Sequence, residues 1–132
     1  MDETRREEGL NMSLQFHIEE TPHYLAVRVT GEGTVDEAWR QYDAIAEHCN
    51  RANKNKLLLD YTGAYADISL CDRYFLGEKA QIFRYRRIKV AVVDRPDQRD
   101  PQMFAEVVAR NRWVNGRGFP NTEDALEWLL KE

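Results

Sequence analysis

The spacing of apolar residues changes along the chain, and this change divides it into strands and helices. Near the N-terminus, apolar residues at every second position over 14–18 and 25–29 predict two half-buried strands. Residues 19–23 have the composition of a turn, so the two strands are expected to pair as an antiparallel hairpin. Gly31-Glu32-Gly33 is expected to end the second strand.

Four helices are predicted after the hairpin from their capping sequences and from apolar steps of three and four residues. Thr34 and Glu37 have the spacing of a capping box and precede an amphipathic stretch that reaches Cys49. Ser69-Leu70-Cys71-Asp72 has the same spacing and predicts a second helix that runs to about Tyr85. Two more helix starts are predicted. One is at Asp100-Pro101, where Asp100 would be the cap and Pro101 the first helical residue, and the other follows the cap Asn121.

Short apolar runs between these helices predict strands that are covered on both faces. Leu57-Leu58-Leu59 and residues 88–93 are each followed by an acid, Asp60 and Asp94, and a further short strand is expected within 115–119. Residues 61–68 are expected to form a loop. Strands that alternate with helices predict an α/β fold with a mixed, mainly parallel sheet, an N-terminal antiparallel hairpin and the order β-β-α-β-α-β-α-β-α.

Composition narrows the class of protein. The 132 residues, 42% of them hydrophobic, predict a single domain over 13–132 behind a charged flexible tail, residues 1–12, in which Met12 is an alternative start. The net charge of −4 argues against nucleic-acid binding. No apolar run is as long as the ~20 residues of a membrane span. Two cysteines give no disulfide pattern, so a cytoplasmic location is expected, with Cys71 as a buried structural thiol.

Several of these segments resemble SpoIIAA-like domains. They are the hairpin, the capped helix after Gly31-Glu32-Gly33, Leu57-Leu58-Leu59-Asp60, Lys89-Val90-Ala91-Val92-Val93, and the ending Phe119 to Leu129. That bacterial superfamily includes the STAS anti-sigma-factor antagonists and is similar in fold to SEC14-type lipid-binding proteins. The resemblance implies a SpoIIAA-like fold and a binding or regulatory role.

The resemblance also points to one serine. In the sigma-regulating antagonists, an Asp-Ser-Ser-Gly segment at the start of a helix carries a serine that a partner kinase phosphorylates. The corresponding stretch here is Asp67-Ile68-Ser69-Leu70, which places Ser69 near the phosphorylated position but lacks the glycine. The chain therefore resembles the uncharacterised SpoIIAA-like relatives more than those antagonists. Ser69 is either a phosphorylation site or simply a helix cap.

No catalytic or metal-binding motif is present, and we expect neither an enzyme nor a cofactor or metal site. Asp60 and Asp94 either orient a polar ligand or cap loops, because ligands gather at the carboxyl ends of parallel strands. The basic run over 84–89 either holds an anionic group or complements a helix C-terminus. The aromatic residues over 61–85 either pack on the third helix or a second subunit, or line an apolar groove.

The leading hypothesis is a non-enzymatic binding or regulatory module whose partner is another protein, a second copy of the chain, or a hydrophobic small molecule. One alternative is a lipid or membrane-surface carrier similar to SEC14-type domains, with peripheral membrane contact, and another is an antagonist switched by phosphorylation of Ser69. The candidate surface consists of aromatic, acidic and basic side chains: Asp60, Tyr61, Tyr65, Asp67, Tyr74, Phe75, Arg84, Arg86, Arg87 and Phe104.

Overall fold

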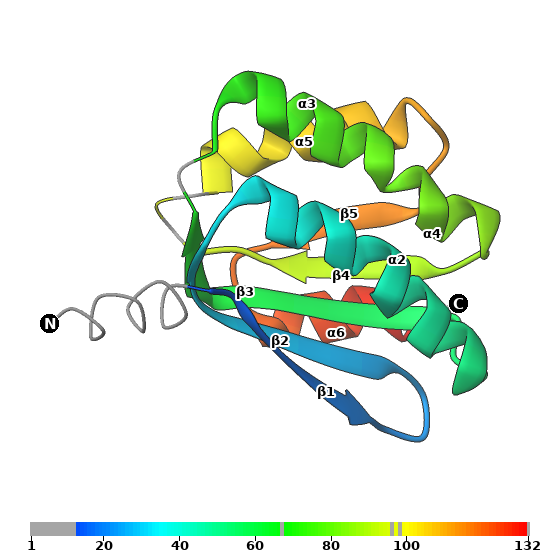
Figure 1. The fold of residues 1–132 in the computed structure, drawn as a ribbon. Coiled ribbons are helices and arrows are strands. Elements are labelled where there is room, and N and C mark those ends of the chain that lie inside the picture. The colour runs from blue at the N-terminus through cyan, green and yellow to red at the C-terminus, as the bar shows by residue number, and fades with distance from the viewer. Residues whose placement is uncertain (1–12, 67, 96, 98, 132) are drawn as a thin grey trace, which may run out of the picture.

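The computed structural model describes residues 13–66, 68–95, 97 and 99–131, so the expected tail and Met12 lie outside the described residues. Its elements, in chain order and with the labels of Figure 1, are β1 Gln15–Glu20, β2 Leu25–Gly33, α2 Val35–Arg51, β3 Lys56–Ala66, α3 Leu70–Lys79, α4 Gln81–Tyr85, β4 Lys89–Val93, α5 Arg99–Arg110, β5 Gly116–Phe119 and α6 Thr122–Leu129. This order confirms the predicted alternation of strands and helices.

The strands form one five-stranded sheet in the order β1-β2-β3-β4-β5. β1 pairs with β2 antiparallel, and the pairs β2–β3, β3–β4 and β4–β5 are parallel. Helices α2, α3, α4 and α5 lie on one face of the sheet, and α6 lies on the other (Figure 1). The mixed sheet with its N-terminal hairpin is the predicted fold class.

Alternate residues of the central strands supply the cores of the two faces. Leu57 and Leu59 pack in the larger core beneath α2, whereas Leu58 packs with Ala125 and Leu129 of α6 in the smaller one. A strand turns successive side chains to opposite faces, so a wholly apolar run is needed when both faces are covered. The prediction of buried strands over 57–59 and 88–93 is confirmed.

Two predicted ends of strands were wrong. β2 continues through Gly31-Glu32-Gly33, and β3 continues to Ala66, because Gly31–Gly33 pair with 64–66 beyond an irregularity in register between Arg28 and Thr30. Gly31 has φ 95°, and a Cβ there would lie 2.7 Å from the Ser13 carbonyl oxygen. The glycine therefore permits a close approach of two backbones and does not end the strand.

The predicted caps of three helices are confirmed. The Glu37 amide donates to Thr34 Oγ1 (3.4 Å) and the Thr34 amide to Glu37 Oε1 (3.0 Å). In the same way, the Asp72 amide donates to Ser69 Oγ (3.1 Å) and the Ser69 amide donates to Asp72 Oδ2 (3.4 Å). At α6 the Asp124 amide donates to Asn121 Oδ1 (2.7 Å). Each cap satisfies amides that have no partner inside the helix.

Three details of the helices differ from the prediction. The second predicted helix is divided at Ala80 into α3 and α4. Asp100 is not a cap, because α5 already begins at Arg99, and Pro101 still lies in the first turn, where no amide is required. Cys71 is exposed. It lies two positions from the buried Arg73, about 200° around the helix, and so faces away from the core.

Candidate functional site

A cavity of about 70 Å³ lies between α2 and α3, above the carboxyl ends of β3 and β4. Parallel strands place their carboxyl ends at one edge of the sheet, where the loops to the next helices leave room for ligands. Most of the wall is apolar, and three tyrosines and three charged side chains take part in it. The lining residues are Leu14, Ala38, Tyr42, Tyr61, Ala64, Tyr65, Ile68, Arg73, Leu76, Asp94 and Arg95.

Two tyrosines form part of the cavity wall from opposite sides, Tyr42 from α2 and Tyr61 from β3. Burial raises the pKa of Tyr42 to about 12, while its hydrogen bond with Tyr61 lowers it in part. Burial also raises the pKa of Tyr61 well above its ordinary value, with the neighbouring Tyr42 adding to the effect. Both phenols are therefore protonated at neutral pH, and their side chains are hydrogen-bonded to each other.

A buried charged pair completes the polar side of the cavity. Arg73 of α3 is 4% exposed, and Asp94, directly after β4, is also 4% exposed. Burial lowers the pKa of Arg73, and the negative charge of Asp94 raises it. A charge is retained in such a place only when an opposite charge accompanies it. The cavity thus combines an apolar wall with phenol groups and two buried opposite charges that attract each other.

The rim of the cavity is formed by Tyr65 and Arg95. The Arg95 guanidinium lies 5.5 Å from the centre of the Tyr65 ring and pairs with Asp97 at 3.0 Å. Its Nη1 donates to the Ala64 carbonyl oxygen (3.4 Å), which fixes the guanidinium across the end of β3. Ser69 is exposed one residue beyond the lining residue Ile68. Its hydroxyl caps α3 and is open to solvent.

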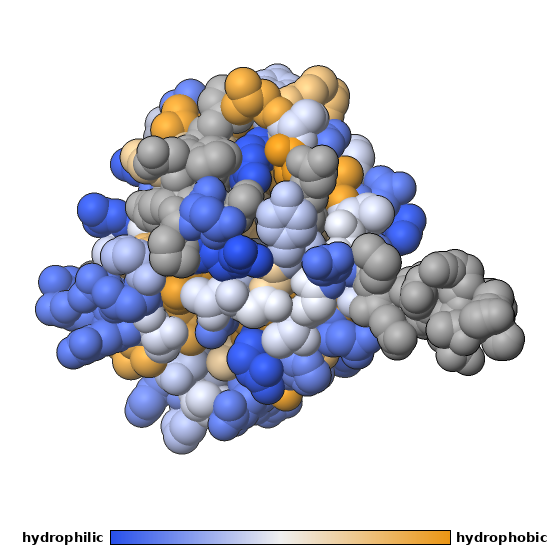
Figure 2. All heavy atoms as spheres, turned by 90° about the vertical axis from the view of Figure 1, so that its left-hand side faces the viewer, coloured by the Kyte–Doolittle hydropathy of each residue, from blue (hydrophilic) through white to orange (hydrophobic). Residues whose placement is uncertain are grey.

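Apolar side chains also gather outside the cavity. Trp39 of α2 stacks on Phe75 of α3, with ring centroids 6.3 Å apart, and both rings are partly exposed. Leu70, at the start of α3, is 65% exposed. Figure 2 views this end of the molecule and shows apolar atoms gathered at the top, where α3 and α5 lie. An exposed apolar patch beside a cavity is typical of a surface that contacts another molecule.

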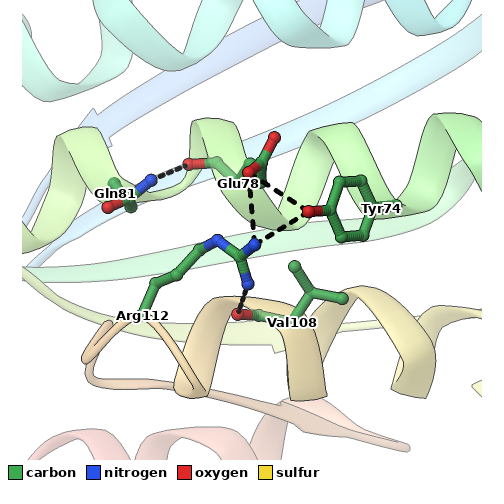
Figure 3. A network of polar contacts seen from close by, with 5 residues as sticks. All are labelled: Tyr74, Glu78, Gln81, Val108 and Arg112. Atoms are coloured by element: carbon green, nitrogen blue, oxygen red, sulfur yellow. Dashed lines mark hydrogen bonds and ion pairs between the residues drawn. The ribbon is translucent and has the colours of Figure 1, made fainter.

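α3 is fixed to α5 by one arginine after α5. Arg112 Nη2 donates to the Tyr74 hydroxyl (2.9 Å) and to Glu78 Oε2 (3.2 Å), and its Nη1 donates to the Val108 carbonyl oxygen (3.2 Å) (Figure 3). Gly77 allows close contact, since a Cβ there would lie 2.7 Å from the Ala105 carbonyl oxygen. The second predicted helix therefore packs on the third. This was one of the alternatives expected for the aromatic residues over 61–85.

A second cavity of about 60 Å³ lies beneath α3 and α5, and Tyr42 and Leu76 line both cavities. Its wall is almost wholly apolar and reaches the first residues of β5. Tyr42 and Leu76 thus lie between two small spaces in one layer. The two spaces together remain small compared with the ~300–1,000 Å³ of a typical small-molecule pocket.

The structure brings together only some of the residues that the sequence singled out. Tyr61 and Tyr65 line the cavity, and Asp94 lies at its base. Asp60 is turned by strand alternation toward the α6 face, where its Oδ1 accepts from the Thr62 amide (2.9 Å) and hydroxyl (2.7 Å). Thr62 belongs to β3, so these hydrogen bonds lie within the strand and do not cap a loop.

The other predicted residues are spread over the molecule. Tyr74 and Phe75 belong to the α3 contacts with α5 and α2. Arg84, Arg86 and Arg87 lie at the far end of the sheet, where β3 and β4 begin. Asp67 and the side chain of Phe104 lie outside the described part of the chain.

The sequence reasoning missed Tyr42, Arg73 and Arg95. A signal was present for Arg73, because it precedes Leu76 by three positions and so lies on the apolar stripe of α3, where a charge is unexpected. Tyr42 lies in the predicted amphipathic helix that reaches Cys49, and nothing in that pattern distinguishes it from the other residues of the apolar face. The contact of Arg95 with Tyr65 joins segments thirty residues apart and has no local signal.

The described residues contain no group of three or more His, Cys, Asp or Glu side chains that could hold a metal ion. In that same part of the chain no helix is both long and apolar enough to cross a membrane.

No family model matches the sequence, and no curated protein is significantly similar to it. Solved structures do match its fold. An uncharacterised DUF3478-family protein with a SpoIIAA-like fold from Shewanella loihica PV-4 shares 21% identity and a TM-score of 0.51, over 89% of this chain and 93% of that one. The unphosphorylated anti-sigma factor antagonist SpoIIAA shares 12% identity and a TM-score of 0.55, over 86% and 94%.

An anti-sigma factor antagonist from Mycobacterium paratuberculosis shares 14% identity and a TM-score of 0.50, over 90% of this chain and 96% of that one. The fold of this chain is thus SpoIIAA-like, as the sequence resemblance implied.

Proposed function

We propose that this chain is a non-enzymatic protein-binding module that takes one side chain of its partner into the cavity between α2 and α3. The observation that carries the proposal is the cavity itself, with its apolar wall, the buried Tyr42, Arg73 and Asp94, and the partly buried Tyr61. Protein interfaces concentrate their binding energy in a few anchor side chains that fill such pockets. The exposed Leu70 and the Trp39–Phe75 pair would supply the surrounding contact.

The volume of the cavity favours a protein partner over a carried lipid. About 70 Å³ accommodates a few water molecules, at ~10–15 Å³ each, or one apolar side chain. A drug-sized or lipid ligand requires a pocket of ~300–1,000 Å³. Two of the fold neighbours are antagonists of anti-sigma factors, which are themselves proteins. Fold analogy alone is a weak argument for function, so it supports the proposal only beside the cavity.

Filling the cavity tests the proposal. Ala64 is buried and lines the cavity, so Ala64→Met should occupy it while the outer surface stays unchanged. Ala109→Met is the matched control, since Ala109 is equally buried but lines the other cavity. The measurement is photo-crosslinking from a benzoylphenylalanine placed at Tyr65, in extracts of the source cells. A discrete crosslinked partner should be lost in Ala64→Met and retained in Ala109→Met.

Equal crosslinking by both variants would contradict the role of the cavity. A wild-type protein that crosslinks to no protein but copurifies with a lipid would favour the carrier alternative instead. Thermal unfolding of both variants provides the check on folding, because overfilled cores are destabilised by ~1–3 kcal/mol.

Phosphorylation of Ser69 is a second candidate feature, favoured by the exposure of its hydroxyl next to Ile68 on the cavity wall. A phosphate there would face the Asp72 carboxylate, which accepts a hydrogen bond from the Ser69 amide at 3.4 Å. Repulsion between the two negative groups would open the capping box at the start of α3. Ser69→Asp should then weaken partner crosslinking while Ser69→Asn, an uncharged cap, should preserve it.

A further inference from the structure

A second concave surface lies at the opposite end of the sheet. It is a basin of about 420 Å³ beside the first residues of β3 and β4, and five of the nine described residues that line it are Lys or Arg: Lys56, Arg84, Arg87, Lys89 and Lys131. Trp113 is another lining residue and is 79% exposed. None of the nine is acidic, although the whole chain carries a net charge of −4. Below, this surface is called the basic basin.

The backbone around the basic basin has a consistent arrangement. Helices α2, α4 and α5 all end on the side where β3, β4 and β5 begin (Figure 1). Each ends with one residue in the left-handed region: Asn53 (φ 60°), Arg87 (φ 58°) and Trp113 (φ 68°). The amides of these residues and of those after them donate back into the helix, as in a Schellman motif.

Glycine or asparagine normally occupies this position, because other residues strain the backbone there. Asn53 follows that rule, whereas Arg87 and Trp113 do not, and these two are the ones whose side chains line the basic basin. Capping alone would be served better by glycine. The choice of a guanidinium and an indole therefore points to a use for the side chains.

Helix C-termini attract cations in any protein, and this explains part of the cluster. Lys89 is used in that way: its Nζ donates to the Trp128 (2.8 Å) and Lys131 (2.9 Å) carbonyl oxygens and lies 4.4 Å from the centre of the Trp128 ring. Arg86 pairs instead with Glu47 at 3.4 Å and does not line the basin. Arg84 and Arg87, at the end of α4, and Lys131, after α6, are exposed cations that line the same hollow.

We propose that the basic basin binds an anion that carries clustered phosphate groups. Its volume lies within the ~300–1,000 Å³ range of small-ligand sites. Converging guanidinium and ammonium groups are the usual recognition elements for phosphate, with Arg binding two oxygens at once. The anion is either a free oligophosphate or the phosphorylated headgroup of a lipid. The site is separate from the cavity between α2 and α3, and its test does not involve that cavity.

The variant Arg87→Gly separates binding from folding. Glycine relieves the strain at φ 58° while removing the cation, so the melting temperature should stay equal or rise. Titration calorimetry with tripolyphosphate at low salt should show binding to the wild type that weakens at least about tenfold in Arg87→Gly. Lys131→Gln should weaken it similarly. Arg40→Gln removes an exposed charge of α2 outside the basin and should leave binding unchanged.

Several outcomes would overturn the proposal. They are no heat of binding with the wild type, equal affinity in wild type and Arg87→Gly, and an equal loss in Arg40→Gln, which would indicate only nonspecific charge attraction. A lower melting temperature for Arg87→Gly would contradict the role assigned to its side chain. Binding of inositol 1,4,5-trisphosphate at least tenfold tighter than tripolyphosphate would identify the headgroup source. Similar affinities would identify a free oligophosphate.

Discussion

The two ends of the parallel strands carry polar groups of different kinds. At the carboxyl end, Arg73 and Asp94 are buried beside two protonated phenols in a small cavity. At the amino end, Arg84, Arg87 and Lys131 are exposed around a wide basin. A buried charge must be compensated inside the protein, whereas an exposed cation is solvated and screened. Substitutions at the carboxyl end should therefore alter the stability of the fold, and substitutions at the amino end should alter the binding of anions.

The largest effect is expected when one member of the buried charged pair is removed. Arg73→Met leaves the Asp94 charge buried without its compensating guanidinium, and the free energy of unfolding should fall by about 3–5 kcal/mol. Urea unfolding followed by circular dichroism measures the change. The double variant Arg73→Met/Asp94→Leu removes both charges and should recover much of the loss. A double variant no more stable than the single one would contradict the pairing.

A smaller loss is expected where α3 contacts α5. Gly77→Ala places a Cβ 2.7 Å from the Ala105 carbonyl oxygen and 2.8 Å from Val108 Cβ, so the helices must separate, at a cost of about 1–3 kcal/mol. Gly116, at the amino end, is the matched control, because a Cβ there meets no atom closer than 3.6 Å. Gly116→Ala should unfold at nearly the wild-type urea concentration. Equal losses in both variants would mean that the loss of stability comes from the general strand or helix propensity of alanine and not from the contact between α3 and α5.

At neutral pH the smallest effect is expected at Tyr42, whose burial acts mainly on the pH dependence of stability. Its pKa in the folded protein is about 12, above the 10.0 of an exposed tyrosine. A raised pKa favours the folded state fully below pH 10, and the advantage is lost as pH rises from 10 to about 12. The free energy of unfolding should thus decline in this window by up to ~1.4 kcal/mol per pH unit for this group. Tyr42→Phe should decline less steeply, and parallel curves would contradict the burial of the phenol.

At neutral pH the same substitution should cost only about 1 kcal/mol, through the lost hydrogen bond with Tyr61. This comparison keeps the effect of ionisation apart from that of the hydrogen bond. Tyr85, which is exposed, offers the control: Tyr85→Phe should leave the stability at neutral pH unchanged.

Local pattern predicted most of the fold. The capping boxes at Thr34 and Ser69 and the apolar strands over 57–59 and 88–93 depend on neighbours within a few residues, and all are confirmed. The prediction failed where pairing between distant segments decided the outcome. Gly31–Gly33 and 64–66 have weak strand propensity, yet each supplies the other with a hydrogen-bonding partner.

The candidate site was predicted less well than the fold. Asp94 was singled out from its position after a predicted strand, and Tyr61 and Tyr65 were singled out from the cluster of aromatic residues over 61–85. Arg73 was missed because its burial depends on Asp94, twenty-one positions away in the chain. In the basic run, only the fold reveals that Arg86 turns to α2 while Arg84 and Arg87 turn to the basin.

The sequence by itself determined where helices and strands form, which of their faces are apolar, and that the fold is an alternating α/β sheet, because capping and periodicity are short-range properties. Only the tertiary structure decided which charges are buried and which are exposed. Arg73 and Arg87 are the same residue type near the ends of neighbouring helices. One is compensated inside the cavity and the other is held open at the basic basin, because burial depends on what the rest of the chain places around each side chain.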